Sequence, residues 1–173
     1  MPALPSTYEP IMNALFAKLQ SELVPTPFTY ASRRLLMWEE LIQSIQSGVA
    51  PILQPSFFLY DGMGFGGGRT EFKRSGRRTE PIRVLHRTIV IYARFPGADT
   101  PSGADTTTAG GTIFAPLSEA VEGVLQETDR EGVQTLGGLV SHVWIEGDSH
   151  WVTPDIVPQG QGMLTIPVQI MIP

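Results

Sequence analysis

The sequence has no cysteine and no long run of apolar residues. Without cysteine there can be neither a disulfide framework nor a metal site with thiolate ligands. No stretch approaches the roughly 18 apolar residues of a membrane-spanning helix, and the first ten residues lack the basic and apolar segments of a secretory signal. We therefore expect a soluble protein that is not exported and that is stabilised by core packing or by contacts between subunits.

Charged residues are also sparse, at 17%, and they are unevenly distributed. Residues 69–87 hold seven of the twelve lysines and arginines but only two glutamates, so this segment carries +5. Because the whole chain carries −5, the remainder carries −10. A field of one sign attracts surfaces of the other sign. The basic segment therefore predicts an interaction surface on an otherwise acidic protein.

Apolar residues recur every three to four positions in two long segments, the pattern of amphipathic helices. The first segment, 8–23, is preceded by Ser6, which with Glu9 has the spacing of a capping box. The other predicted helices are Thr112–Gln126 and a shorter one, Trp38–Ser47.

Five segments have the composition or alternation of β-strands: Tyr30–Leu36, Ser56–Tyr60, Pro81–Phe95, Leu139–Glu146 and Met163–Ile172. Pro167 in the last one cannot donate a backbone hydrogen bond, so it is tolerated at a sheet edge or where its nitrogen points outward, and we expect this strand at an edge. Gly147–Gln161 would be a long connection between antiparallel neighbours. Exposed edges pair readily with other chains, which suits an oligomer.

The order of these elements lacks the strict strand–helix alternation of a parallel sheet. It predicts an α+β fold, with a mostly antiparallel (mixed) sheet and two main helices packed on one face. The length of 173 residues and the 42% hydrophobic content fit a single domain, 1–173. We predict flexible loops at about 61–80 and 96–111, since the first is rich in glycine and arginine and the second has no apolar residue larger than alanine.

The glycine-rich segment contains the spacing of a dinucleotide-binding motif, at Gly62, Gly64 and Gly67, after a predicted strand. Such a motif must open a helix whose N-terminus holds the pyrophosphate. The following residues have Phe72 as their single large apolar side chain, and Pro81 then blocks a helix. We therefore expect a flexible loop or hairpin tip here, and no cofactor.

The arginines after the glycines could contact nucleic acid or a protein. Sequence-specific nucleic-acid binding is not favoured, because the chain is acidic overall and shows neither a recognition helix nor a stacking platform. An acidic protein surface, including that of a neighbouring copy, is the plainer partner. The candidate protein interface comprises Arg69, Phe72, Lys73, Arg74, Arg77 and Arg78.

The histidines do not form a convincing catalytic or metal site. His86 and His142 fall inside predicted strands, and none of the three histidines has a helical partner four residues away. His142 and His150 could meet Asp148 or Asp155 near Ser141, but there is no nucleophile elbow, and alternation puts Ser141 and His142 on opposite faces of a strand. We expect no metal site and no enzymatic activity.

The C-terminal third contains TLGGLVSHVWIEG (135–147) and, after a loop, LTIPVQIMIP (164–173). These segments resemble the tail terminator proteins of long-tailed bacteriophages. SRRLLMW (32–38) and QPSFFLY (54–60) occur in the same order and near the same spacing as in that family. The resemblance covers most of the chain from Ile11 onward, although segments 61–80 and 97–106 depart from the family pattern.

The resemblance implies a structural virion protein of the viral tail, made in the host cytoplasm. Its subunits would form a ring, a hexamer, that caps the tail tube, ends tube polymerisation and joins the tail to the head. Its partners would be other copies of itself, the tail tube protein and the head–tail connector at the neck. Genomic DNA would pass through the ring with only transient contact, and no membrane is involved. Two alternatives stay open: another neck or connector protein, or, with less support, a nucleic-acid-binding protein.

Overall fold

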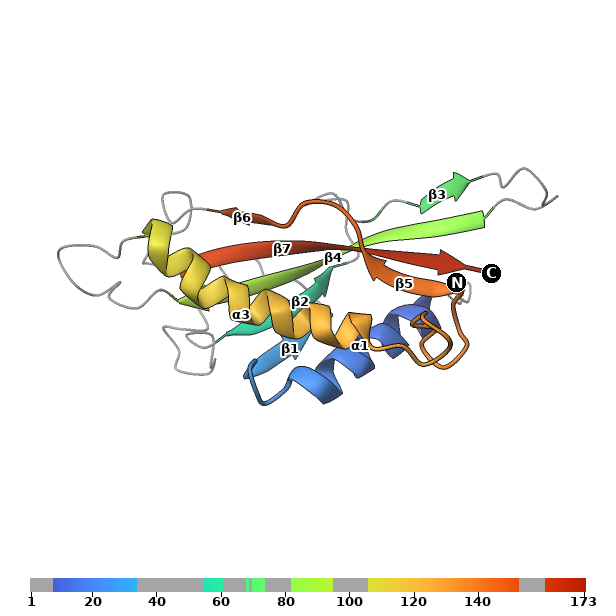
Figure 1. Ribbon diagram of the computed structural model, residues 1–173, viewed down its shortest axis with the longest axis horizontal. Helices are drawn as coiled ribbons and strands as arrows, with labels where there is room; N and C mark the ends of the chain where they lie inside the picture. The colour runs from blue at the N-terminus through green and yellow to red at the C-terminus, as the bar shows by residue number, and fades with distance from the viewer. Residues whose placement is uncertain are drawn as a thin grey trace, which may run out of the picture.

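The computed structural model describes residues 8–33, 55–60, 68, 70–73, 82–94, 106–152 and 161–173. These parts form a seven-stranded sheet and two long helices (Figure 1). In chain order the elements are α1 (Glu9–Leu23), β1 (Tyr30–Ser32), β2 (Ser56–Tyr60), β3 (Thr70–Lys73), β4 (Ile82–Arg94), α3 (Thr106–Gln126), β5 (His142–Ile145), β6 (His150–Val152) and β7 (Gln161–Ile172).

Two long strands, β4 and β7, form the centre of the sheet and pair with each other from Arg83↔Ile172 to Arg94↔Gln161. On the far side of β4 lie β2 and β3, and on the far side of β7 lie β5 and β6. All of these pairs are antiparallel, whereas β1 joins β2 in parallel. The predicted α+β fold with a mostly antiparallel, mixed sheet is therefore confirmed.

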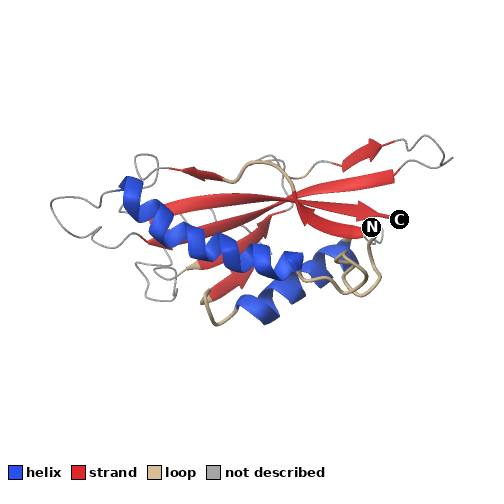
Figure 2. Ribbon diagram, viewed as in Figure 1, coloured by secondary structure: helices blue, strands red, loops and turns tan. Residues whose placement is uncertain are grey.

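Both helices cover the same face of the sheet, as predicted (Figures 1 and 2). The helical stripe predicted over 8–23 is the buried side of α1, and the predicted apolar residues of α3 from Phe114 onward are buried as well. The alternate residues of β4 and β7 that face the helices complete the core. The strand residues of this core are Phe57, Leu59, Leu85, Ile89, Ile91, Ala93, Val143, Leu164, Ile166, Val168, Ile170 and Ile172.

The second face of the sheet is buried at its centre too. Phe58 and Val90 on this face are fully buried, and Phe58 packs edge-on against Tyr92 with ring centroids 5.4 Å apart. Burial raises the pKa of Tyr92 to about 12, because the phenolate would lose its hydration. Burial on both faces explains why residues 89–93 of β4 are apolar without interruption.

Local predictions about the first helix and strand need correction. The helix begins at Glu9, with Tyr8 at the N-cap, so Glu9 does not occupy the third helical position of a capping box; Ser6 lies outside the described residues. Glu9 instead forms an ion pair with Arg33, which also donates to Asn13 at 2.7 Å. Arg33 follows β1, and these contacts fasten that strand to α1.

The final strand is not at an edge, which corrects the expectation drawn from Pro167. Its residue Pro167 lies opposite Thr88 of β4. On its other side, β5 pairs with residues 168–171 and β6 with residues 163–165, so Pro167 falls in the interval between the two strands. The missing donor is accommodated by a break in the neighbouring strand. The predicted connection Gly147–Gln161 correspondingly contains β6, which the sequence reading missed.

Both predicted loops contain regular structure. Residues 70–73, inside the predicted loop 61–80, form β3, and residues 106–111, inside the predicted loop 96–111, begin α3. Backbone hydrogen bonds form these elements whether or not the side chains are apolar, so a pattern based on apolar residues cannot detect them. The rest of both loops lies outside the described residues, as does the predicted short helix Trp38–Ser47.

Candidate interaction surface

The strands β2 and β3 occupy the same side of β4 and behave as one interrupted strand. Tyr60 pairs with Thr88 and Thr70 pairs with Leu85. The partners Thr88 and Leu85 are separated by only two residues of β4, and Gly68, with φ +80°, donates its amide to the carbonyl of His86 at 2.9 Å. The element that follows the glycine tract is a strand rather than the helix that a dinucleotide site requires.

The basic hairpin consists of β3 and the part of β4 paired with it, 82–85. The last pair of this ladder is Lys73↔Ile82, the two residues on either side of the connection 74–81. Register places Phe72 opposite Arg83, on the face that the helices cover elsewhere. The helices do not reach this end of the sheet (Figure 1). As a result Phe72 is 63% exposed.

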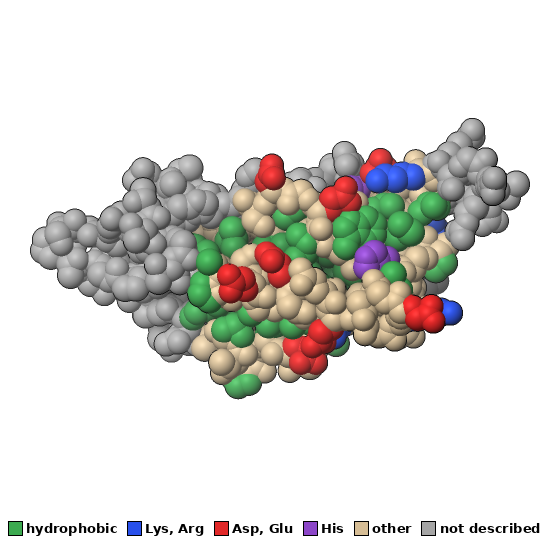
Figure 3. All heavy atoms as spheres, viewed as in Figure 1, with side chains coloured by type: hydrophobic (Ala, Val, Ile, Leu, Met, Phe, Trp, Pro, Cys, Tyr) green, Lys and Arg blue, Asp and Glu red, His purple; other side chains and the backbone are tan. Residues whose placement is uncertain are grey.

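Two of the six predicted interface residues are placed by the structure. Phe72 and Lys73 are both exposed on β3, and apolar and basic side chains lie beside each other at this end of the viewed face (Figure 3). Arg69, Arg74, Arg77 and Arg78 lie outside the described residues. Of the other basic residues in the segment, Arg83 is half-buried, and Arg87 is buried and donates to the carbonyl of His86 at 2.8 Å.

The other face of the basic hairpin carries a small charged group. Glu71 Oε2 lies 3.1 Å from His86 Nε2 and 3.7 Å from Lys73 Nζ. Glu71 and His86 come from the two paired strands, so this contact helps to hold β3 on β4. His86, a candidate titratable residue in the sequence, therefore has a structural partner.

His142, in β5, also has structural partners. Its Nδ1 atom accepts a hydrogen bond from the amide of Gln134 at 3.3 Å, and its ring stacks on Trp144 with centroids 5.3 Å apart. Ser141 lies just before β5 and donates its amide to the carbonyl of Met171 at 2.8 Å. His142 is thus a satisfied strand histidine. The side chains of His150 and Asp155 lie outside the described residues.

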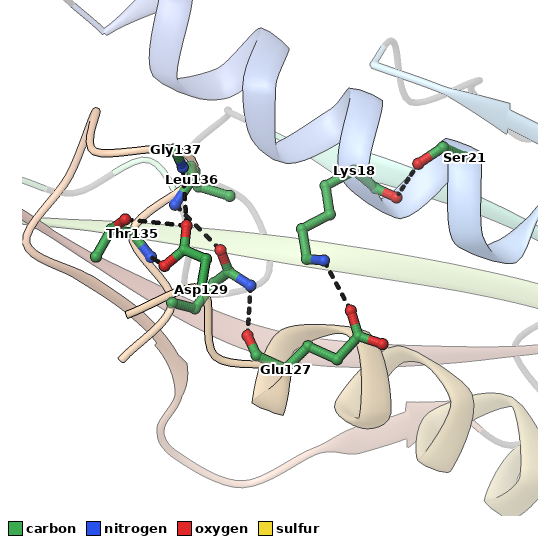
Figure 4. A network of polar contacts seen from close by, with 8 residues as sticks. Lys18, Ser21, Glu127, Asp129, Thr135, Leu136 and Gly137 are labelled. Carbon is green, nitrogen blue, oxygen red and sulfur yellow. Dashed lines mark hydrogen bonds and ion pairs between the residues drawn. The ribbon is translucent and has the colours of Figure 1, made fainter. Parts of the chain in front are cut away.

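A second surface, which the sequence reading did not single out, is the acidic loop, residues 127–141 between α3 and β5. The carboxylate of Asp129 organises it (Figure 4). Oδ1 accepts from the amide of Thr135 at 2.7 Å, and Oδ2 accepts from the hydroxyl of Thr135 at 2.9 Å and the amide of Gly137 at 2.8 Å. The hydrogen bond from Gly137, followed by those from Thr135, lowers the pKa of Asp129.

The far end of the acidic loop is a turn with left-handed backbone. Leu136, Gly137 and Gly138 have φ of 51°, 70° and 89°. This turn points Leu136 into the core, where it is 8% exposed, and leaves Leu139 46% exposed. The amide of Val140 donates to the carbonyl of Thr135 at 3.1 Å, so Leu139 lies within the turn, and β5 begins at His142 instead of at the predicted Leu139.

Gln134 braces the acidic loop from within and is 2% exposed. Its side chain donates to the carbonyl of Glu127 and accepts from the amide of Leu136, and its carbonyl accepts from the amide of Val143 in β5. Lys18 of α1 adds an ion pair to Glu127 at 2.9 Å. The loop is therefore fastened to α1, α3 and β5. The sequence does contain a signal for this loop: Asp129 stands six residues before Thr135, and the pair Gly137 and Gly138 comes soon after that threonine.

The described residues were also compared with the requirements of a metal site and of a membrane-spanning helix. Among the described residues, no group of three or more histidine, aspartate or glutamate side chains is arranged to hold a metal ion. None of the described helices is long and apolar enough to cross a membrane. Comparison with known proteins gave no match, either to a protein-family model or to a curated protein sequence.

Proposed function

We propose that this protein is a structural subunit of a bacteriophage virion that forms a ring, a hexamer, at the end of the tail tube. The ring stops polymerisation of the tube and joins the tail to the head-side connector. The proposal rests on the resemblance of segments 135–147 and 164–173 to tail terminator proteins. The α+β fold agrees with what that resemblance implies, although many unrelated functions share such folds.

One structural observation supports a ring subunit most directly. The two large apolar side chains that are exposed in the described part of the chain are Phe72, on the edge strand β3, and Leu139, in the loop that leads into the edge strand β5 on the other side of the sheet. A protein that joins its neighbours side by side in a ring uses two different surfaces, one on each flank.

A different neck or connector protein is the main alternative, since it would also assemble from such surfaces. A nucleic-acid-binding protein is the other alternative, and the basic segment 69–87 is the feature that favours it. The placed charges support it weakly. Glu71 sits among the basic residues of the hairpin, and Arg87 is buried rather than available to phosphate.

Electron microscopy of the purified protein, alone and mixed with tail tubes, tests the proposal. We expect rings with sixfold symmetry that bind one end of the tube and prevent its further growth. Rings that bind a head-side connector but leave tube growth unchanged would instead identify a different neck protein. A monomer that binds DNA with a steep dependence on salt concentration, and that ignores tubes, would favour the nucleic-acid alternative.

A further inference from the structure

We infer that the basic hairpin of one subunit docks on the acidic loop of the next, with Phe72 and Leu139 at the centre of the contact. The inference rests on the proposed ring and specifies how neighbouring subunits meet. It assigns both partners of the interface to this chain, and it follows from three observations on the described residues: their level in the sheet, their exposed apolar side chains and their charge.

The level of the two surfaces in the sheet is fixed by strand register. Across β3, β4, β7 and β5, Glu71, Val84, Met171 and His142 form one continuous row of partners. Phe72 lies in the adjacent row with Arg83 and Ile172, and Ser141 is bonded to Met171 at that same end. The hairpin and the end of the loop that leads into β5 therefore lie at one level of the sheet, at opposite edges. Subunits placed side by side would bring one against the other.

The apolar side chains supply the centre of the interface. Phe72 is 63% exposed and Leu139 is 46% exposed, while Leu136, three residues before Leu139, is buried. A large apolar side chain that becomes buried at the centre of an interface, with polar groups around it, is a common form of interface anchor. Each surface carries one such anchor.

Charge makes the two surfaces complementary and favours a second copy as the occupant. The described residues of the hairpin include Lys73 and Arg83 against Glu71, a net charge of +1. In the acidic loop, the exposed residues 127–131 include Glu127, Asp129 and Glu131 against Arg130, a net charge of −2. Opposite charges around the apolar anchors would orient the approach and disfavour contact between two hairpins or two loops.

The acidic loop is also ordered before any partner arrives. Its shape is set by the three hydrogen bonds to Asp129 and by the brace of Gln134. A surface that is already in its bound conformation loses less conformational entropy on association. Leu139 is thus presented on a rigid support, with the hairpin as the element that adjusts to it.

The interface has two different halves, so variants with opposite defects give a sharp test. Phe72→Glu places an anion where the acidic loop would dock and leaves the loop intact. Leu139→Lys places a cation where the basic hairpin would dock and leaves the hairpin intact. Gln20→Glu and Gln20→Lys, at an exposed position of α1, are the matched charge controls. Circular dichroism and thermal melts establish that each variant is folded.

We expect each interface variant to raise the concentration at which rings form by at least about tenfold, in keeping with loss of an interface anchor. The two Gln20 controls should form rings like the wild type. Native mass spectrometry of the two interface variants mixed in equal amounts should show association of one variant with the other, beginning with heterodimers. Each heterodimer would join the intact loop of the Phe72→Glu subunit to the intact hairpin of the Leu139→Lys subunit.

The outcomes separate this inference from the proposed function. If both interface variants form rings at the wild-type concentration, the interface is wrong while the ring stands. If the mixture yields no heterodimer although each variant is defective alone, the pairing of hairpin with loop is wrong. If the wild-type protein remains monomeric both alone and with tail tubes, the proposed function fails and the interface fails with it.

Discussion

The acidic loop and the basic hairpin each expose one large apolar side chain, but they are held in different ways. Side chains bonded to backbone shape the loop, chiefly Asp129 and Gln134. Backbone pairing with β4 shapes the hairpin, with a side-chain contact between Glu71 and His86. The loop therefore depends on a few specific residues, whereas the hairpin depends on its register. Substitutions at single positions should disturb the loop more than the hairpin.

The largest effect is expected within the turn of the acidic loop. Leu136→Ala removes a side chain that is 8% exposed and should lower the free energy of unfolding by about 2–3 kcal/mol, the cost of a core truncation. Leu139→Ala, three residues later and 46% exposed, should change it by less than about 0.5 kcal/mol. Urea denaturation below the assembly concentration measures both. Equal losses would mean that the turn does not divide buried from exposed leucine in this way.

The next effect concerns the left-handed backbone of the same turn. Gly137→Ala keeps the amide that Asp129 binds and meets no neighbouring atoms, but it forces an alanine to φ +70°. We expect a loss of about 1 kcal/mol in stability. Gly123→Ala in α3 also has open space around the added methyl and should raise stability by about 0.5–1 kcal/mol. Thermal melts of the two variants measure both changes. A change of the opposite sign in either variant would contradict the prediction.

A smaller, local effect should follow the titration of Asp129. Its pKa is lowered in the folded protein, first by the hydrogen bond from Gly137. The stabilisation is therefore complete above the ordinary aspartate pKa of about 4 and is lost as the pH falls through the lowered value. Hydrogen exchange at the amides of Thr135 and Gly137, corrected for intrinsic rates, should show protection falling in that window. Asp129→Asn should flatten this dependence; an unchanged profile in the variant would contradict it.

The smallest effect on the isolated subunit is expected in the hairpin. Phe72→Thr keeps a residue suited to a strand and removes a side chain that is already 63% exposed. The free energy of unfolding should change by less than about 0.5 kcal/mol. A loss of several kcal/mol in urea denaturation would show that Phe72 belongs to the core of the subunit and would remove the contrast between hairpin and loop.

The sequence predicted those elements whose residues repeat with a clear period. The stripe of α1 and the span of β2 agree with the prediction, and β4 differs from it by one residue at each end. Elements formed mainly by backbone hydrogen bonds escaped detection. Thr70–Lys73 has no apolar alternation, yet it forms β3 because β4 offers a free side to pair with. In such segments the strand that pairs with them determines the structure, and the local sequence does not show which strand that is.

The candidate site could be predicted only in part, for the same reason. Phe72 and Lys73 were identified through the unusual charge of their segment, and both are exposed. Leu139 was assigned to a strand, because no periodic pattern reveals that Gly137 and Gly138 turn the chain just before it. The opposition of the two surfaces depends on β3 and β5 pairing with different strands at one level, which only the assembled sheet defines.

The interval beside Pro167 has a consequence for the solubility of the free subunit. Because β5 and β6 are separate strands of four and three residues, the flank of the sheet that they form offers no long uninterrupted ladder of backbone groups. Short, broken flanks of this kind discourage the open-ended strand addition that leads to fibrils. Copies of the subunit would then associate through side-chain contacts between the basic hairpin and the acidic loop, and assembly would stop when the ring is closed.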